Sequence, residues 1–370
     1  MQRITNTSVI SLPSNSMKQE SPNAPVGFSC PLPLPAGRRV LLGHGSGGKL
    51  SAELLQEVFL PALGNPVLDR MEDQAVVSLN GMRLAMTTDS FVVKPVFFKG
   101  GDIGSLAVHG TINDLAMGAA RPLWMSVAFI LEEGLQLDVL RRVVASMQAA
   151  ADKAGVQIVT GDTKVVEKGS ADGLYINTTG IGLVREGISL SASQARPGDA
   201  IIVSGMVGDH GIAILAEREG LKFETDVRSD SAALHELVGT LLEATQQVRC
   251  LRDPTRGGLS STLNEIAGSS RVGMELEETS IPVREEVRGA CEMLGLDPLY
   301  VANEGKLVAI VAAEAAERAL GALRSHELGR AAQIIGHVTE AHPRMVVMRT
   351  VFGTTRIVDM LAGDQLPRIC

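Results

Sequence analysis

The residues best suited to covalent chemistry lie at the end of the chain, in Pro367-Arg368-Ile369-Cys370. A terminal thiol can move between two sites, because nothing beyond it has to be packed or hydrogen-bonded. Gly363 loosens the backbone upstream, and Pro367 keeps the residue before it away from the helical region. We therefore expect an extended, mobile tail that carries a chemical group on Cys370. A terminal cysteine without any role is the alternative that its position leaves open.

A second set of candidates consists of five acidic residues that stand far apart in the sequence: Asp73, Asp89, Asp114, Asp162 and Asp253. Each one alone is explained by ordinary turn chemistry or a solvated helix face. Together with the glycine loops at 43–48 and 257–258 they indicate a magnesium nucleotide site. Carboxylate oxygens are hard ligands for Mg²⁺, while backbone N–H groups and lysines hold phosphates.

The glycine segment Gly43-His44-Gly45-Ser46-Gly47-Gly48-Lys49 comes close to the phosphate-binding pattern G-x-x-x-x-G-K-[ST]. It departs from that pattern at Leu50, because the missing hydroxyl is the group that would hold magnesium. We expect a loop that cradles phosphate at the start of a helix running from Leu50 to Phe59, rather than a true P-loop. A plain flexible loop remains the alternative.

The elements that must position the first acids alternate between strand and helix. Two strands around Asn80-Gly81 form a predicted hairpin, which would bring Asp73, before it, and Asp89, after it, close together. Apolar periodicity predicts the remaining elements of a first domain spanning 38–195. These are a helix at 103–116 that carries Asn113-Asp114, a strand at 123–131, a helix at 137–154, a strand at 156–159 leading into Asp162 and Lys164, and a strand at 174–184.

The turn cluster Arg196-Pro197-Gly198-Asp199 is the predicted border of a second domain, 196–344. Its predicted elements are a strand at 200–204, a helix beginning near 209, helices at 232–248 and 258–267 separated by the Asp253 loop, a helix at 284–294, a strand at 307–311, a helix at 313–323 and a strand at 332–338. Glu304 and Lys306 flank a glycine before the strand at 307–311. Residues 345–370 are expected to be a weak strand and tail, and residues 1–37 a disordered extension.

Composition excludes several classes of function. The net charge of -8 and the 3% aromatic content argue against a nucleic-acid partner, and the charge favours bound cations. The four cysteines show no C-x-x-C spacing, so neither a disulfide framework nor a cysteine zinc site is indicated. No segment has the pattern of a signal peptide or a membrane span, and we expect a cytoplasmic protein without a membrane partner.

Eight short motifs of the chain resemble those of the HypE family of hydrogenase maturation factors, in the aminoimidazole-ribotide-synthetase-like (PurM-like) superfamily. They are His44-Gly45-Ser46-Gly47-Gly48, Glu72-Asp73-Gln74-Ala75, Thr88-Asp89-Ser90, Asn113-Asp114, Gly161-Asp162-Thr163-Lys164-Val165-Val166, Asp253-Pro254-Thr255-Arg256-Gly257-Gly258, Asn303-Glu304-Gly305-Lys306 and Pro367-Arg368-Ile369-Cys370. The resemblance spans residues 40–370. The terminal motif and the Gly-Asp-Thr-Lys run are specific to this family, whereas the acids are shared across the superfamily.

The resemblance implies an α/β (α+β) fold of two PurM-like domains. The N-terminal domain would bind ATP, and its sheets would pair across a homodimer so that ATP lies near the interface. The C-terminal α/β domain would be followed by the flexible tail. Nucleotide binding is assigned by motif to His44, Ser46, Gly47, Gly48, Asp89, Asn113, Asp162 and Thr163, and Mg²⁺ binding to Asp73, Asp89, Asp114, Asp162 and Asp253.

The resemblance also implies a reaction. In this family a HypF carbamoyltransferase loads a carbamoyl group onto the terminal thiol. ATP then drives dehydration of the thiocarboxamide to a thiocyanate, whose cyano group passes to iron on a HypC–HypD scaffold for a [NiFe] hydrogenase. Carried over by motif, Cys370 is the carrier. Phosphorylation makes the amide oxygen a good leaving group, and a base must remove protons from nitrogen; we expect Glu304 to be that base and Lys164 to steady the oxygen or the phosphoryl group.

Three other interpretations remain open. A small-molecule kinase of the superfamily would have no use for Cys370, and a selenophosphate synthetase would place a reactive cysteine and lysine just before the glycine loop, where Cys30 has no neighbouring lysine. A non-catalytic scaffold could bind nucleotide and dock partners through its tail. The roles of Glu72 and of residues 1–37, the direction of the tail and the number of bound ions are not determined by the sequence.

Overall fold

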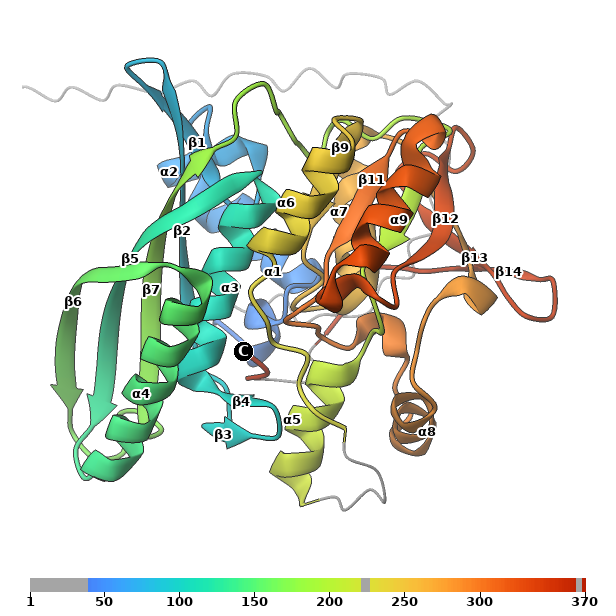
Figure 1. Ribbon diagram of the computed structural model, residues 1–370. Coiled ribbons are helices and arrows are strands. Elements are labelled where there is room, and N and C mark those ends of the chain that lie inside the picture. Colours follow the sequence, from blue (N-terminus) through green and yellow to red (C-terminus); the bar gives the residue numbers. More distant parts are fainter. Residues whose placement is uncertain (1–38, 221–226, 364–367) are drawn as a thin grey trace, which may run out of the picture. The chain divides into compact units, whose positions relative to one another are not determined.

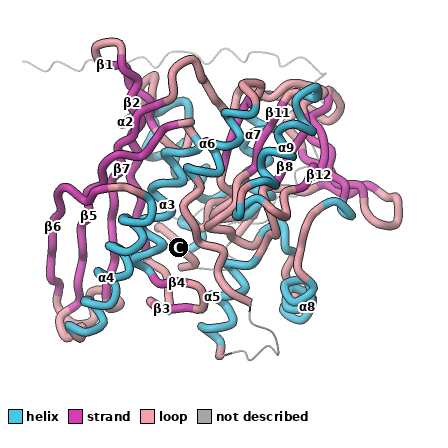
Figure 2. The backbone as a smooth tube through the Cα atoms, viewed as in Figure 1, coloured by secondary structure: helices cyan, strands magenta, loops and turns pink. Residues whose placement is uncertain are grey.

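The computed structural model describes residues 39–220, 227–363 and 368–370. The predictions for residues 1–37 and for 364–367 therefore lie outside the described residues. From Leu41 to Cys370 the chain forms one compact unit built around two sheets. Figures 1 and 2 show its helices and strands.

The first sheet has the strand order β1-β2-β7-β5-β6. Its strands are β1 (Ala75–Leu79), β2 (Met82–Phe91), β5 (Ala120–Glu132), β6 (Gln157–Val166) and β7 (Leu174–Val184). Neighbouring strands are antiparallel except β5 and β6, which are parallel and joined by helix α4 (Leu137–Ala154). Helices α3 (Ile103–Met117) and α4 cover one face of this sheet (Figure 1). The alternating burial along β7 shows why: every second side chain packs on the helices.

The predicted hairpin is confirmed. Asn80 and Gly81 both have positive φ, 50° and 83°, as a type I′ turn requires. One detail of the prediction is wrong, because β2 continues to Phe91 and Asp89 therefore lies within the strand instead of after it. Thr87 Oγ1 donates to the carbonyl oxygen of Asp73 at 3.1 Å, which ties the two outer ends of the hairpin together.

The second sheet has the order β14-β13-β10-β12-β8-β11-β9. Its strands are β8 (Ala200–Val203), β9 (Val248–Arg252), β10 (Gly273–Glu277), β11 (Val308–Val311), β12 (Gln333–Thr339), β13 (Val346–Arg349) and β14 (Thr355–Ile357). Strands β11 and β12 both pair antiparallel with β8, which lies between them. Together with the helix α9 (Ala316–Ser325) that joins them, they form a split β-α-β unit.

Both faces of the second sheet are buried, so its central strands have continuous apolar runs. Ile201 and Val203 of β8 pack toward helix α7 (Gly258–Ser270), whereas Ile202 packs toward α9 and helix α6 (His235–Ala244). Helices α5 (Asp209–Glu219) and α8 (Glu285–Leu294) form a smaller cluster of their own.

Several predicted boundaries are wrong. The helix predicted at 232–248 ends at Ala244, and the residues after it form β9, because Val248, Cys250 and Leu251 pair with β11 in the core. The weak strand predicted after residue 344 is β13, a buried strand parallel to β10. Strand β6 does not end at Val159 but continues through the Asp162 segment as the outer strand of the first sheet.

The N-terminal helical segment consists of α1 (Lys49–Leu54), a π turn at Leu55–Phe59 and α2 (Leu60–Leu63). Two short strands, β3 (Phe97–Phe98) and β4 (Gly101–Asp102), precede α3. Within the described parts of the chain, every helix is too short or too polar to cross a bilayer.

Candidate active site

A cavity of about 800 Å³ collects most of the predicted site residues. It lies among the glycine loop before α1, strand β2, helix α3, the β9–α7 connection and the Glu304 segment. We call it the acidic cavity. Its lining includes His44, Gly47, Gly48, Asp73, Asp89, Asp114, Asp253, Arg256, Glu304 and Cys370. Residues from seven separate parts of the sequence therefore share one site, as the motif interpretation predicts.

The C-terminal residues are held inside the molecule, between α3 and α5 (Figure 1). Val92 N donates to a main-chain oxygen of Cys370 at 3.0 Å, and Lys94 N donates to the carbonyl oxygen of Arg368 at 3.2 Å. The Arg368 guanidinium bonds Asp172. The structure therefore shows the inward position that the sequence could not distinguish from an outward one.

The Cys370 thiol is only partly exposed and lies beside carboxylates. Burial raises the pKa of this thiol to about 12; Arg256 opposes the rise, while Glu304, Asp89 and Asp253 add to it. At neutral pH the inward thiol is consequently protonated and a poor nucleophile. Arg256 is a cation that the sequence placed in a motif without a role, and the structure puts it in the same cavity as the thiol.

Four of the five predicted magnesium ligands gather at this cavity. Burial raises the pKa of Asp114 well above its ordinary range, and the charges of Asp253, Asp89 and Asp73 raise it further. The pKa of Asp253 rises to about 8, through burial first and then through Asp73. Carboxylates that repel one another in a low-dielectric site favour a bound cation.

Arg252, at the end of β9, is a site residue that sequence reasoning missed. Its guanidinium bonds the Asp73 carboxylate, donates to the carbonyl oxygen of Met71 at 2.6 Å and lies 3.6 Å from the Glu265 carboxylate. It is buried and fixes the position of Asp73. The signal that could have found it is the short apolar strand ending at Arg252, directly before the Asp253 loop.

Glu304, the predicted base, is 3% exposed, and its Oε1 has no hydrogen-bond partner. Burial raises its pKa well above the ordinary range, and Asp253, Asp89 and Asp230 raise it further, against Arg256. A buried carboxylate oxygen without a partner is costly, so its retention in a cavity is typical of a functional group. Its position fits the predicted role.

The predicted nucleotide contact of Asn113 stays a prediction, and the structure places its side chain outside the lining of the acidic cavity. Its Nδ2 donates to the carbonyl oxygens of Ala232 at 3.1 Å and Glu304 at 3.2 Å, and its Oδ1 accepts from Leu234 N at 2.8 Å. The side chain is buried and its donor and acceptor groups are engaged with backbone. Asn113 supports the Glu304 segment.

The glycine loop lines the acidic cavity only in part. Gly48 must be glycine, because a Cβ atom there would lie 2.1 Å from the carbonyl oxygen of Leu361. Two of the N–H groups expected to bind phosphate already have partners: Gly47 N donates to Ser51 Oγ and Lys49 N to Leu361 O. Ser46 does not line the cavity, since its hydroxyl donates to Gly43 O at 2.7 Å.

Asp162, Thr163 and Lys164 do not reach the acidic cavity of their own chain. They lie on the outer strand β6, where the side chains of Asp162 and Lys164 are 63% and 68% exposed. Lys164 Nζ donates to Asp162 at 2.5 Å, and this hydrogen bond with that from Thr163 N lowers the pKa of Asp162. The expectation of one five-acid cluster is therefore wrong for a single chain, because β6 continues as the sheet edge instead of ending at a site.

The four clustered acids do not form a closed metal cage. Among the described residues, no group of three or more His, Cys, Asp or Glu side chains is close enough together to hold a metal ion. Mg²⁺ commonly keeps several waters and takes one or two carboxylates plus substrate phosphates. The donor set therefore fits an ion that is shared with a nucleotide.

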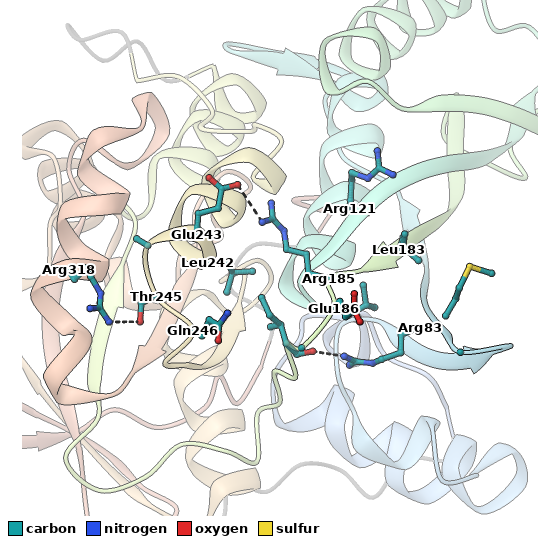
Figure 3. Close-up of a pocket in the computed structure, with 16 residues that line it drawn as sticks. Arg83, Arg121, Leu183, Arg185, Glu186, Leu242, Glu243, Thr245, Gln246 and Arg318 are labelled. Carbon is teal, nitrogen blue, oxygen red and sulfur yellow. Dashed lines mark hydrogen bonds and ion pairs between the residues drawn. The ribbon is translucent and has the colours of Figure 1, made fainter.

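A second cavity, of about 950 Å³, lies between the hairpin end of the first sheet and the end of α6 (Figure 3). Its arginines are largely engaged: Arg83 bonds Ile188 O, Arg185 lies 3.5 Å from the Glu243 carboxylate, and Arg318 donates to Thr245 Oγ1 at 3.1 Å. It contains neither a thiol nor an acid cluster. The acidic cavity is therefore the candidate active site.

Comparisons with known proteins agree with this geometry. Residues 71–184 match the N-terminal domain, and residues 196–348 the C-terminal domain, of AIR synthase related proteins. "Carbamoyl dehydratase HypE" of Azotobacter vinelandii is 61% identical over 327 residues, 88% of this chain and 96% of that protein. Its namesake from Escherichia coli K12 is 46% identical, over 90% of this chain and 99% of that one.

Two solved structures extend the comparison. A HypE structure in complex with ATP is 53% identical to this chain with a TM-score of 0.76, and the match covers 90% of this chain and all of the other. A HypE–HypF complex contains a chain that is 49% identical with a TM-score of 0.80, covering 83% of this chain and 99% of that one. Both show the same two-domain PurM-like fold.

Proposed function

Because the chain belongs to the HypE family of carbamoyl dehydratases, we propose that Cys370 carries the carbamoyl group which this ATP-dependent enzyme of hydrogenase maturation dehydrates. The observation that carries the residue assignment is that the Cys370 thiol and the Glu304 carboxylate line one cavity with four acids. This arrangement supports a carrier thiol and a base that act beside a bound nucleotide.

The proposed reaction begins with Cys370 as a thiocarboxamide. The amide oxygen takes the terminal phosphoryl group of ATP, which releases ADP. The nitrogen loses its first proton to solvent as the oxygen is phosphorylated, which gives a C=N double bond. Glu304 then accepts the second proton from nitrogen while the C–O bond breaks and phosphate leaves, which gives the thiocyanate. The unbonded Oε1 of Glu304 is suited to this task because no other protein group competes for it. Arg256 is placed to balance negative charge that develops beside the carrier sulfur.

We also propose that Mg²⁺ binds with the nucleotide. Asp73, Asp89, Asp114 and Asp253 would hold it together with phosphate oxygens, and it would supply neutralisation of charge on the transferred group. The raised pKa values of Asp114 and Asp253 support this, because burial and mutual repulsion disfavour the ionised carboxylates there and a bound cation would offset both effects. Asp89 also remains a candidate for nucleotide contact, with His44, Gly47 and Gly48.

We further infer a homodimer joined through β6. This outer strand exposes Val159 and Val165 by 58% and 67%, next to Asp162 and Lys164. A long strand edge with exposed apolar side chains is normally covered in the native assembly. In a dimer, the acidic cavity of the partner subunit would receive Asp162, Thr163 and Lys164. A dimer would thus explain why these motif residues lie far from the cavity of their own chain.

Two partners follow from the family assignment. A HypF-like carbamoyltransferase would load the carbamoyl group onto Cys370. A solved HypE–HypF complex, in which one chain is 49% identical to this protein, supports this proposal. A HypC–HypD iron scaffold would receive the cyano group. That transfer and the cytoplasmic location stay predictions.

Intact-protein mass spectrometry tests the function. Protein carbamoylated at Cys370 should lose one water on addition of MgATP, and Cys370→Ala should bind ATP but carry no carbamoyl group. An unchanged mass with bound nucleotide would leave only the scaffold interpretation. Phosphate transfer to an added small molecule, independent of Cys370, would favour the kinase.

A further inference from the structure

Two adjacent residues outside every motif, Ser229 and Asp230, contact the two halves of the active site separately. Ser229 Oγ bonds His210 Nδ1 at 2.7 Å, and His210 Nε2 bonds the carbonyl oxygen of Ile369 at 2.9 Å. Because a carbonyl only accepts, Nε2 carries the proton and Nδ1 accepts from the serine. Ser229 thus reaches the residue next to the carrier thiol through one imidazole.

Asp230 reaches the proposed base. Its Oδ1 accepts from Glu304 N at 3.0 Å, and its Oδ2 lies 3.1 Å from Lys306 Nζ in a buried ion pair. The backbones are in such close contact that a Cβ atom on Gly305 would lie 1.8 Å from the carbonyl oxygen of Asp230. The position of Glu304 therefore depends directly on the position of Asp230.

The rest of the surroundings makes this segment rigid. Ser229 N donates to Lys99 O at 2.9 Å, and Ser231 N donates to Ser229 Oγ at 3.1 Å. The His210 ring is fully buried and packs edge-on against Phe98, with ring centroids 5.7 Å apart. Movement of the segment would break contacts on both sides.

We propose that Ser229 and Asp230 are positioning residues, which fix the carrier end of the chain and Glu304 relative to each other for the dehydration step. Consecutive Cα atoms are about 3.8 Å apart across a trans peptide, so a shift of Ser229 also shifts Asp230 and the contacts that Asp230 makes. Misplacement of reacting groups by about 1 Å costs a rate factor on the order of 100. The inference rests on the proposed function of Cys370 and Glu304, and adds the residues that align them.

The test uses full-length protein carbamoylated at Cys370 and measures single-turnover dehydration by intact mass at increasing MgATP. Ser229→Ala and Asp230→Asn should each slow the maximal rate by about 10- to 100-fold while the half-saturating ATP concentration stays unchanged. Ser325→Ala and Asp138→Asn are matched controls on exposed sites, where the hydroxyl bonds Ala322 O and the carboxylate pairs with Arg141. They should retain the normal rate.

A second measurement distinguishes the effect of Ser229 on the chain end from the effect of Asp230 on Glu304. Alkylation of Cys370 by iodoacetamide in the unmodified protein should accelerate in Ser229→Ala, which loosens the carrier end, but not in Asp230→Asn, which affects Glu304. A general structural defect would accelerate both. Asp230→Ala combined with Lys306→Gln removes the buried pair without leaving a lone charge and also removes the oxygen that accepts from Glu304 N, so this double variant should still be slow.

Normal maximal rates in Ser229→Ala and in the double variant would overturn the inference. If wild-type protein itself failed to lose water, the proposed function would fail instead, so the two failures are distinguishable.

Discussion

Releasing the end of the chain should make Cys370 far more reactive. Arg368→Ala removes the bond to Asp172 and the one from Arg368 Nε to Val92 O at 2.9 Å. In the inward position the thiol has a pKa of about 12, so at pH 8 about one molecule in ten thousand is thiolate. A free cysteine, with a pKa of ~8.5, is thiolate in about a quarter of molecules. The two populations differ by roughly three orders of magnitude.

The assay compares the iodoacetamide rate at Cys370 in wild type, in Arg368→Ala and in the free peptide Leu-Pro-Arg-Ile-Cys, by mass mapping of the C-terminal peptide, because intact mass would also count alkylation of Cys30. Wild type should react slowest by up to about a thousandfold, and the variant should approach the peptide. The buried thiols Cys250 and Cys291 serve as internal references that should not react. A wild-type rate equal to that of the peptide, or a variant no faster than wild type, would refute the reasoning.

Three more predictions concern charge and assembly. Glu304→Gln should bind ATP normally in calorimetry yet leave the carbamoyl group intact, and normal water loss would remove Glu304 from the base role. Asp253 has a folded pKa of about 8 against ~3.9 unfolded, so its own contribution to stability is fully present below about pH 4 and is lost as pH rises toward 8. Asp253→Asn should remove this part of the pH dependence in urea titrations, and curves parallel to those of the wild type would contradict it. Val159→Glu with Val165→Glu should convert the proposed β6 dimer to monomers, as measured by light scattering, and should abolish dehydration. A fully active monomer would exclude an active site shared between two subunits.

Local signals were sufficient for elements whose partners lie nearby in the sequence. The Asn80-Gly81 hairpin, α4 and β7 agree with prediction, because turn chemistry and apolar period act within a few residues. Strand β13 was misjudged for the opposite reason. It spans four residues, and its place in the core depends on pairing with β10, about seventy residues earlier in the chain.

The same distinction applies to the site. Motif spacing identified the acids, Glu304 and Cys370, and the structure brings them together. The backbone contacts of Asn113 could not be predicted, because the atoms that bond its amide belong to residues 119 to 191 positions away. Asp162 looked like its fellow acids in sequence, and only the extension of β6 to Val166 shows that it faces away from the cavity of its own chain.

The way the carrier end is held explains how one site can serve several chemical states of the thiol. The contacts that fix it go to main-chain oxygens of Arg368, Ile369 and Cys370, and to the Arg368 side chain. Among the described residues, none hydrogen-bonds the Cys370 sulfur. Under the proposed function, adding a carbamoyl group or removing water from it would therefore break none of the hydrogen bonds that hold the chain end. A substrate that entered from solution would need recognition contacts of its own. Here the backbone of the last three residues supplies them, so the unbonded Oε1 of Glu304 is not needed to hold the substrate.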